Sequence, residues 1–157
     1  MINTYRYGGH KTFHKDGKVQ KVDVSPSDIL EIKGPFLQVT ITHPRIIQEE
    51  LRRKRQKVPS LHVNALIDTG ANTSVISSKI ADELNLIHTG YQKVLSVQDE
   101  QDQPVYYGFI IFPWGNGKEI PIVCCPLKDI DCLIGRDILK HWHFTYNGAD
   151  GSITICD

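Results

Sequence analysis

The sequence lacks the features that would assign it to a membrane or secreted class. Its longest apolar stretches, such as Phe109 to Trp114, are far shorter than the roughly 20 residues that a membrane-spanning helix needs. The first residues, Met1 to Gly17, contain no apolar core, so we expect no secretory signal there. We therefore expect a cytoplasmic protein that does not bind membranes.

An excess of charge of either sign is also lacking. Eighteen basic residues balance eighteen acidic ones, so no overall field draws the molecule to nucleic acid. A local basic run, Arg52 to Lys57, could bind nucleic acid or an acidic partner, or offer a self-cleavage site. Because the run is short and the net charge is zero, a solvated loop is the favoured interpretation and nucleic acid is not an expected partner.

Cysteine is scarce, and its spacing shows neither a C-x-x-C pair nor an evident metal-ligand pattern. In a chain without a signal we interpret these residues as reduced, mostly buried thiols. His10 and His14 stand four apart, but the glycines around them argue against a helix, and two ligands make a metal site improbable. We predict no metal and no organic cofactor. The cysteines are Cys124, Cys125, Cys132 and Cys156.

Short stretches with alternating apolar residues dominate the 157-residue chain. Phe36 to Thr42 is one such predicted strand, and Leu61 to Ile67 is another. Two brief helices are expected at Ser77 to Leu86 and at Arg136 to Trp142, and a turn at Asp99 to Gln103. The pattern predicts an all-β domain with one or two short helices, either closed or sandwich-like. The remaining expected strands are Lys93 to Val97, Val105 to Phe112, Lys118 to Cys124, Cys132 to Ile134 and the hairpin from Phe144 to Cys156.

We expect one domain, preceded by an N-terminal extension and interrupted by a basic insertion. Residues 1–34 are polar and are treated as an N-terminal extension of uncertain structure. Residues 35–157 form the predicted domain. A basic insertion at about residues 45–57 is expected as a short helix or a solvated loop between two strands.

The most informative stretch is the run from Ala65 to Thr73, in which an apolar strand leads into Asp68-Thr69-Gly70. A carboxylate in such a turn can activate water as a general base. Thr69 can hydrogen-bond the neighbouring backbone, and Gly70 lets another group approach the carboxylate closely. The alternative is an ordinary Asx-turn residue at the end of a strand.

A second motif, Asp131 to Leu139, places two apolar residues and a glycine ahead of a short helix. In this order the two motifs resemble the retropepsin-like aspartic proteases, over roughly residues 35–145. The resemblance implies one lobe of an acid protease barrel per chain, with Asp68, Thr69 and Gly70 as the catalytic loop. It also implies that Ala71 and Asn72 contact substrate, and that the strand behind the loop and the helix after it support the site through Ile134, Gly135 and Arg136.

The resemblance further implies a flap hairpin at Lys93 to Phe112, with substrate contacts from Val97, Gln98 and Asp99. Two departures from the retroviral pattern stand out. The expected flap tip, Gln98 to Gln103, has no glycine and three acids. Arg136 faces Asn72 where the retroviral enzymes have an aspartate, so a charge pair becomes a charge-assisted hydrogen bond.

The chain contains a single Asp-Thr-Gly motif, whereas the mechanism needs two carboxylates that share one proton. We therefore expect a homodimer with Asp68 on its twofold axis and a peptide or protein substrate. The segment from Gly148 to Asp157 is our expected interface. The favoured hypothesis is an aspartic endopeptidase. Its rivals are a catalytically silent dimeric peptide-binding scaffold with the same fold, and a nucleic-acid factor acting through the basic run.

Overall fold

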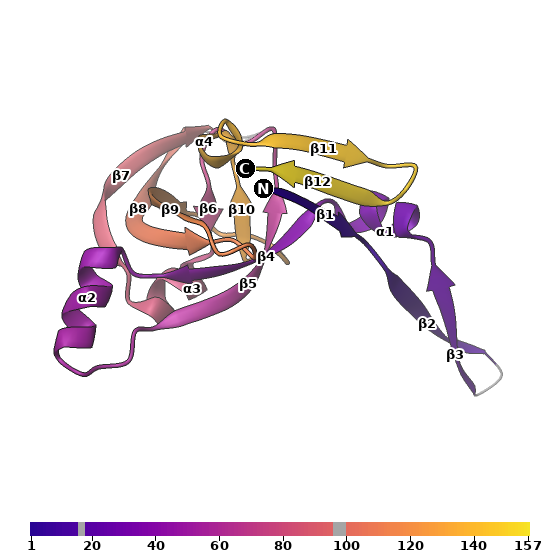
Figure 1. Cartoon of the computed structure of the whole chain (residues 1–157), viewed down its shortest axis with the longest axis horizontal. Coiled ribbons are helices and arrows are strands. Elements are labelled where there is room, and N and C mark those ends of the chain that lie inside the picture. Colours follow the sequence, from indigo (N-terminus) through magenta and orange to yellow (C-terminus); the bar gives the residue numbers. More distant parts are fainter. Residues whose placement is uncertain (16–17, 96–99) are drawn as a thin grey trace. The chain divides into compact units, whose positions relative to one another are not determined.

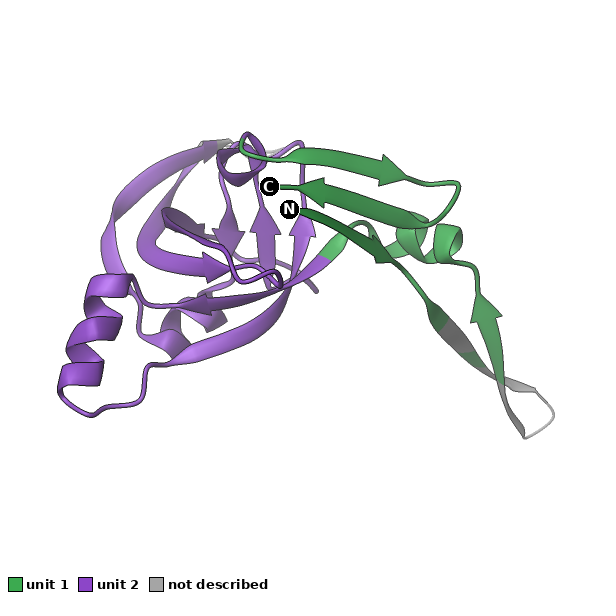
Figure 2. Ribbon diagram, viewed as in Figure 1, with its two compact units in different colours: residues 1–36, 141–157 green, residues 37–140 purple. Residues whose placement is uncertain are grey.

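A computed structural model describes the whole chain except residues 16–17 and 96–99. The chain divides into two compact units (Figure 2), residues 1–36 with 141–157 and residues 37–140. The first unit combines both ends of the chain, whereas the sequence prediction treated residues 1–34 as a separate extension. The predicted all-β class with short helices is confirmed by the strands and helices below.

The larger unit is built on one sheet that closes into a ring (Figure 1). Its strand order is β4-β5-β10-β6-β9-β8-β7, and β4 also pairs with β8, so six strands form the ring and β7 extends it beyond β8. These strands are β4 (Phe36–Thr42), β5 (Ser60–Ile67), β6 (Val75–Ile76), β7 (Ile87–Leu95), β8 (Glu100–Ile111), β9 (Gly117–Cys124) and β10 (Cys132–Ile134).

Alternation along the strands explains which side chains fill the core. In β4 the side chains of Leu37, Val39 and Ile41 are buried, while Gln38 between them is exposed. Successive side chains of a strand point to opposite faces, so the predicted half-buried strand is confirmed. The same period in β5 buries Val63, Ala65 and Ile67.

Strand β10 is short but central. It runs parallel to β5, with Ile134 opposite Ile67, and antiparallel to β6, with Leu133 opposite Val75. Parallel neighbours end at the same side of a sheet. The residues that follow β5 and β10, Asp68 and Gly135, are therefore brought side by side.

Four helices connect the strands of the part that the structure describes: α1 (Pro26–Lys33), α2 (Arg45–Arg53), α3 (Ser78–Leu84) and α4 (Arg136–Leu139). The helix predicted at Ser77 to Leu86 is confirmed as α3, which buries Ile80, Ala81 and Leu84 on one face. The basic insertion, expected as a short helix or a loop, forms helix α2. Helix α4 ends at Leu139, three residues before the predicted end at Trp142. Helix α1 was not predicted; Ser25 caps it by accepting a hydrogen bond from the Asp28 N–H.

The smaller unit contains a three-stranded antiparallel sheet in the order β1-β12-β11, and a separate hairpin of β2 and β3. The side chains of Ile153 and Ile155 in β12 are fully buried, and Leu30 of α1 is also fully buried. Gly151, at φ +65°, turns the chain between β11 and β12 where an added Cβ would lie 2.0 Å from the Pro26 carbonyl carbon. The predicted C-terminal hairpin is confirmed. The strands are β1 (Ile2–Arg6), β2 (Gly9–Lys15), β3 (Lys18–Val24), β11 (His143–Asn147) and β12 (Ser152–Cys156).

The predicted turn at Asp99 to Gln103 is wrong over most of its length. Strand β8 begins at Glu100, and Gln101 pairs with Val94 while Asp102 pairs with Lys93. Hydrogen bonding to β7 overrides the weak strand preference of these polar residues.

None of the helices in the described part of the chain is both long and apolar enough to cross a membrane.

Candidate active site

Asp68 stands directly after β5, in a tight turn that orients its carboxylate. Its N–H donates to the Ile134 carbonyl at 3.0 Å, which continues the β5–β10 pairing by one residue. The Oδ1 atom accepts a hydrogen bond from the Gly70 N–H at 2.8 Å, and the Ala71 N–H donates to the Asp68 carbonyl at 3.3 Å. The carboxylate is thus held by its own loop, and the side chain is half-buried.

Gly135 lies against the back of this loop, where only glycine fits. An added Cβ would lie 2.5 Å from the Thr73 carbonyl carbon and 2.9 Å from the Ser74 nitrogen. The next two residues bind the loop through their backbones, because the Arg136 N–H donates to the Ala71 carbonyl at 2.9 Å and the Asp137 N–H to the Asn72 carbonyl at 3.2 Å. The end of β10 and the start of α4 therefore support the turn that carries Asp68 directly.

The Arg136 side chain makes three further bonds to the same loop. Its guanidinium donates to the Thr69 carbonyl at 2.8 Å, to the Gly70 carbonyl at 3.2 Å, and to Oδ1 of Asn72. The structure thus brings Arg136 and Asn72 together as a charge-assisted hydrogen bond. The fork geometry of a guanidinium suits this contact with several oxygens at once.

Ser74 and Asp137 form a link that the sequence analysis missed. The Ser74 N–H donates to Asp137 Oδ2 at 2.9 Å, and the Ser74 hydroxyl donates to Oδ1 at 2.8 Å. The same hydroxyl oxygen accepts the Gly135 N–H at 3.1 Å. An acid in the first turn of a helix is usually a favourable charge at the N-terminus, so the sequence alone gave no signal for this link.

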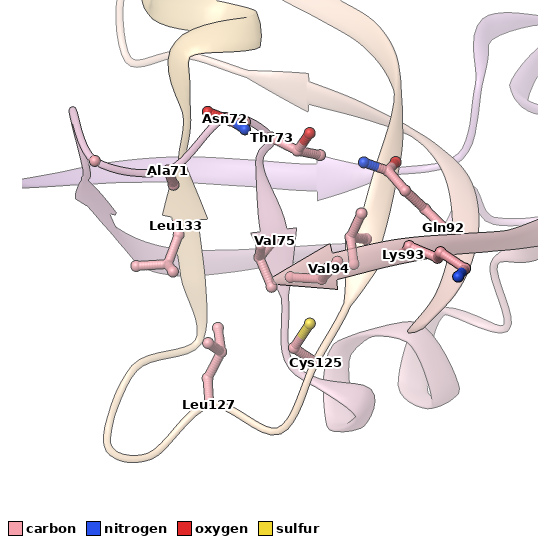
Figure 3. A pocket seen from close by; sticks show the side chains of 12 residues that line it. Ala71, Asn72, Thr73, Val75, Gln92, Lys93, Val94, Cys125, Leu127 and Leu133 are labelled. Atoms are coloured by element: carbon pink, nitrogen blue, oxygen red, sulfur yellow. The ribbon is translucent and has the colours of Figure 1, made fainter. Parts of the chain in front are cut away.

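A cavity of about 430 Å³ opens beside the loop (Figure 3). Ala71 and Asn72, two of the expected substrate contacts, line it, as does Gly70. Figure 3 places Asn72, Thr73 and Gln92 along one side and Cys125 and Leu127 on the other. Much of the lining is apolar, which suits a side chain of a bound peptide. The remaining lining residues are Val75, Lys93, Val94, Val123 and Leu133.

Three expected substrate contacts, Val97, Gln98 and Asp99, lie outside the described residues. The hairpin contributes to the cavity farther back, through Gln92, Lys93 and Val94 of β7. Val94 could have been found, since it is an apolar residue of the expected hairpin. Gln92 precedes that expected hairpin and carries no sequence signal.

The thiols near the site are not suited to nucleophilic attack. Burial raises the pKa of Cys125, which lines the cavity, and raises that of Cys132 to about 12. A protonated thiol is a poor nucleophile, so the site does not fit cysteine chemistry. In residues 1–15, 18–95 and 100–157 we find no group of three His, Cys, Asp or Glu side chains that could hold a metal ion. The arrangement offers an oriented carboxylate next to an apolar cavity.

This chain is similar to a known protein family and to several solved structures. The model of the family described as retroviral aspartyl protease matches residues 33–147. A retropepsin-like aspartic protease from Rickettsia conorii has a similar fold, with a TM-score of 0.50 at 13% identity over 99% of this chain and 94% of that one. A comparison with curated protein sequences gives no match.

Two further solved structures are similar at lower TM-scores. EIAV protease in complex with the inhibitor HBY-793 gives 0.49 at 19% identity, over 68% of this chain and 86% of that one. The retroviral protease-like domain of Ddi1 from Leishmania major gives 0.44 at 17% identity, over 71% and 81%.

Proposed function

The chain belongs to the retroviral aspartyl protease family, and on that premise we propose that it is an aspartic endopeptidase that works as a homodimer. The observation that carries the proposal is the orientation of Asp68. Its Oδ1 is engaged by the Gly70 N–H at the edge of an apolar cavity. Gly70, Ala71 and Asn72 of the same loop line that cavity, where the proposal places a bound peptide.

The proposed chemistry uses two copies of Asp68. Carboxylates about 3 Å apart share one proton, because two like charges at that distance are not both ionised. The charged member takes a proton from a water molecule, whose oxygen attacks the scissile carbonyl carbon. The protonated member then donates its proton toward the leaving nitrogen as the C–N bond breaks. We expect activity to be best at mildly acidic pH.

The need for a second copy follows from the count of motifs. The sequence holds one Asp-Thr-Gly, and Asp150 is followed directly by Gly151. Twofold symmetry supplies the second carboxylate from an identical chain. A monomer would lack the acid and should be inactive.

The test compares three proteins on a peptide library at about pH 5 and pH 7. Asp68→Asn should abolish cleavage while the fold and dimer persist, because an amide cannot act as the base. The matched control is Asp82→Asn on α3, an exposed site, which should cleave as the native chain does. Cleavage retained by Asp68→Asn would refute the mechanism.

The alternative is a silent dimeric module that binds peptides with the same cavity. The cavity favours it, because an apolar lining binds a side chain whether or not the carboxylates react. A transition-state analogue of aspartic proteases should raise the melting temperature of a true enzyme, and Asp68→Asn should remove that shift. A shift that persists in the variant, without any cleavage, would favour the silent module.

A further inference from the structure

Helix α2 and the turn after it hold a dense group of positive charges. Residues 45–57 contain six of the eighteen basic residues and two of the eighteen acidic ones, so the rest of the chain has twelve basic residues against sixteen acidic ones. All the side chains from Arg52 to Lys57 are exposed. We call the basic residues of this stretch the basic patch; they are Arg52, Arg53, Lys54, Arg55 and Lys57.

Helix α2 is anchored to the larger unit along its length. The buried side chain of Gln48 donates to the His43 carbonyl at 2.7 Å. At the start of the helix the Arg45 N–H donates to the Glu119 carboxylate at 3.0 Å. The Arg45 guanidinium also lies over the Phe109 ring, 5.0 Å from its centre. The basic patch at the other end of α2 is therefore carried by a fixed element and not by a loose loop (Figure 1).

Arg55 occupies a backbone position at which glycine is the favoured residue. Its φ is +56°, in the left-handed region. The Arg55 N–H donates to the Arg52 carbonyl at 3.0 Å. The Gln56 N–H donates to the Leu51 carbonyl at 2.8 Å, which completes a Schellman motif. Because a Cβ crowds the backbone in this conformation, the turn itself would favour glycine, and the arginine side chain has no role in ending the helix.

Much of the charge of the basic patch is not neutralised within the chain. Lys54 Nζ lies 2.6 Å from Glu50 Oε1, one turn earlier in the helix. Arg53, Arg55 and Lys57 form no ion pair with any residue that the structure describes. Positive charge in the last turn of a helix is favourable, but the effect fades beyond that turn. The helix dipole therefore accounts for Arg53 and leaves Arg55 and Lys57 unexplained.

We propose that the basic patch is a docking surface for a short acidic peptide segment of a partner protein. The carboxylates of that segment would pair with Arg53, Arg55 and Lys57, and a guanidinium suits a carboxylate because it donates two parallel hydrogen bonds. The inference does not depend on the proposed protease activity.

The charge distribution favours a short peptide over nucleic acid. Proteins that bind duplex DNA often contact about 6–10 phosphates, more than the basic patch offers. The rest of the chain carries more acidic than basic residues, so it repels a long polyanion that extends beyond the patch. A short acidic segment avoids that repulsion.

The first experiment measures binding of a fluorescein-labelled hexaglutamate peptide by polarisation at about 50 mM salt. The triple variant Arg53→Gln, Arg55→Gln, Lys57→Gln should weaken binding about fivefold or more. A control that replaces three exposed lysines of other elements with Gln removes the same charge and should weaken binding less than about twofold. Equal losses in the two variants, or no binding by the native chain, would overturn the proposal. The control lysines are Lys33, Lys79 and Lys140.

The second experiment replaces the peptide with duplex DNA of about 12 base pairs at about 150 mM salt. The native chain should bind the duplex more weakly than it binds the peptide under the same conditions. Tighter binding of the duplex, lost in the triple variant, would make the patch a nucleic-acid surface and overturn the proposal.

A third experiment uses Arg55→Gly to separate a binding role from a structural one. Glycine relieves the left-handed backbone, so the melting temperature should rise by about 2 °C. Hexaglutamate binding should weaken about twofold or more, whereas Arg55→Lys, which keeps the charge, should bind as the native chain does. A rise in melting temperature with unchanged binding would remove Arg55 from the docking surface and contradict the proposal. None of these measurements depends on cleavage, so a failure of the protease proposal would leave them unaffected.

Discussion

Asp137 connects two segments that lie 63 residues apart in the sequence. Both of its carboxylate oxygens accept hydrogen bonds from Ser74, one from the N–H and one from the hydroxyl. Its Oδ1 also accepts the Ile138 N–H at 3.0 Å. The Asp137 carboxylate is therefore bonded on both oxygens within the support of the loop that carries Asp68.

We predict that Asp137→Asn lowers the free energy of unfolding by about 1–3 kcal/mol. An amide has one acceptor oxygen, so its NH₂ must face one of the donors that the carboxylate now accepts. Urea denaturation measures the change, with Asp82→Asn as the exposed control. A loss below about 0.5 kcal/mol, the usual effect of a surface change, would contradict the assigned role.

The buried thiol of Cys132 makes the free energy of unfolding depend on pH in the alkaline range. Burial raises the pKa of its thiol to about 12, well above its ordinary value. Above about pH 9 the unfolded chain loses this proton while the folded chain keeps it, so stability falls as the pH rises through this window.

We expect Cys132→Ala to flatten that dependence. The native chain should lose up to roughly 1.4 kcal/mol per pH unit more than the variant between about pH 9 and 11. Denaturation curves at several pH values measure the two slopes, and the comparison is of slopes because the variant also loses buried volume. Equal slopes would show that the thiol titrates similarly in both states.

At the scale of elements, the cavity is assembled from the loop after Asp68, from single residues of β6, β9 and β10, from β7, and from the segment between β9 and β10. The last of these supplies Leu127, which Figure 3 places at the far side from Asn72 and Thr73. The volume available to a peptide side chain therefore depends on a loop that has no part in holding Asp68.

We predict that Leu127→Trp changes which peptides are cleaved. A larger ring fills part of the cavity, so kcat/KM should fall about tenfold or more for peptides with a bulky apolar residue, and less for those with a small one. Ile46→Trp on α2, which is 74% exposed, is the control. An equal loss for all peptides would place Leu127 outside the specificity pocket.

The elements differ in how far they could be predicted from the sequence. The strand before Asp68 was predictable because apolar residues alternate along it. Strands β2 and β3 were not, because their residues are mainly polar and their order comes from pairing with each other. The Ser74–Asp137 link depends on a long-range approach between β10 and β6 that no local pattern reports. Local patterns thus predicted the strand and turn that carry Asp68, and long-range packing determines the supports of that turn.

For the whole molecule, the essential property is that each proposed site belongs to two chains. A protomer with Asp68→Asn would still pair with a native protomer, because an amide has nearly the same size and shape as a carboxylate. The mixed dimer has one carboxylate and should be inactive.

We therefore predict that added Asp68→Asn protein inhibits the native enzyme. With a threefold excess of the variant and free exchange of subunits, cleavage should fall to about a quarter, since about a quarter of native protomers then meet a native partner. Peptide cleavage after mixing and equilibration measures this. Unchanged cleavage would mean that a single chain is sufficient.

The central place of β10 has a consequence for how the chain reaches its folded state. Strands β5 and β6 are made early but pair with each other only through β10, which follows some 55 residues after β6. Pairings between distant segments form slowly, because the intervening chain loses entropy first. During synthesis the ring cannot close, and Asp68 cannot acquire its supports, until residue 137 has emerged. Any proteolytic capacity of the proposed kind would thus arise only after the whole stretch from Asp68 to Asp137 has been made.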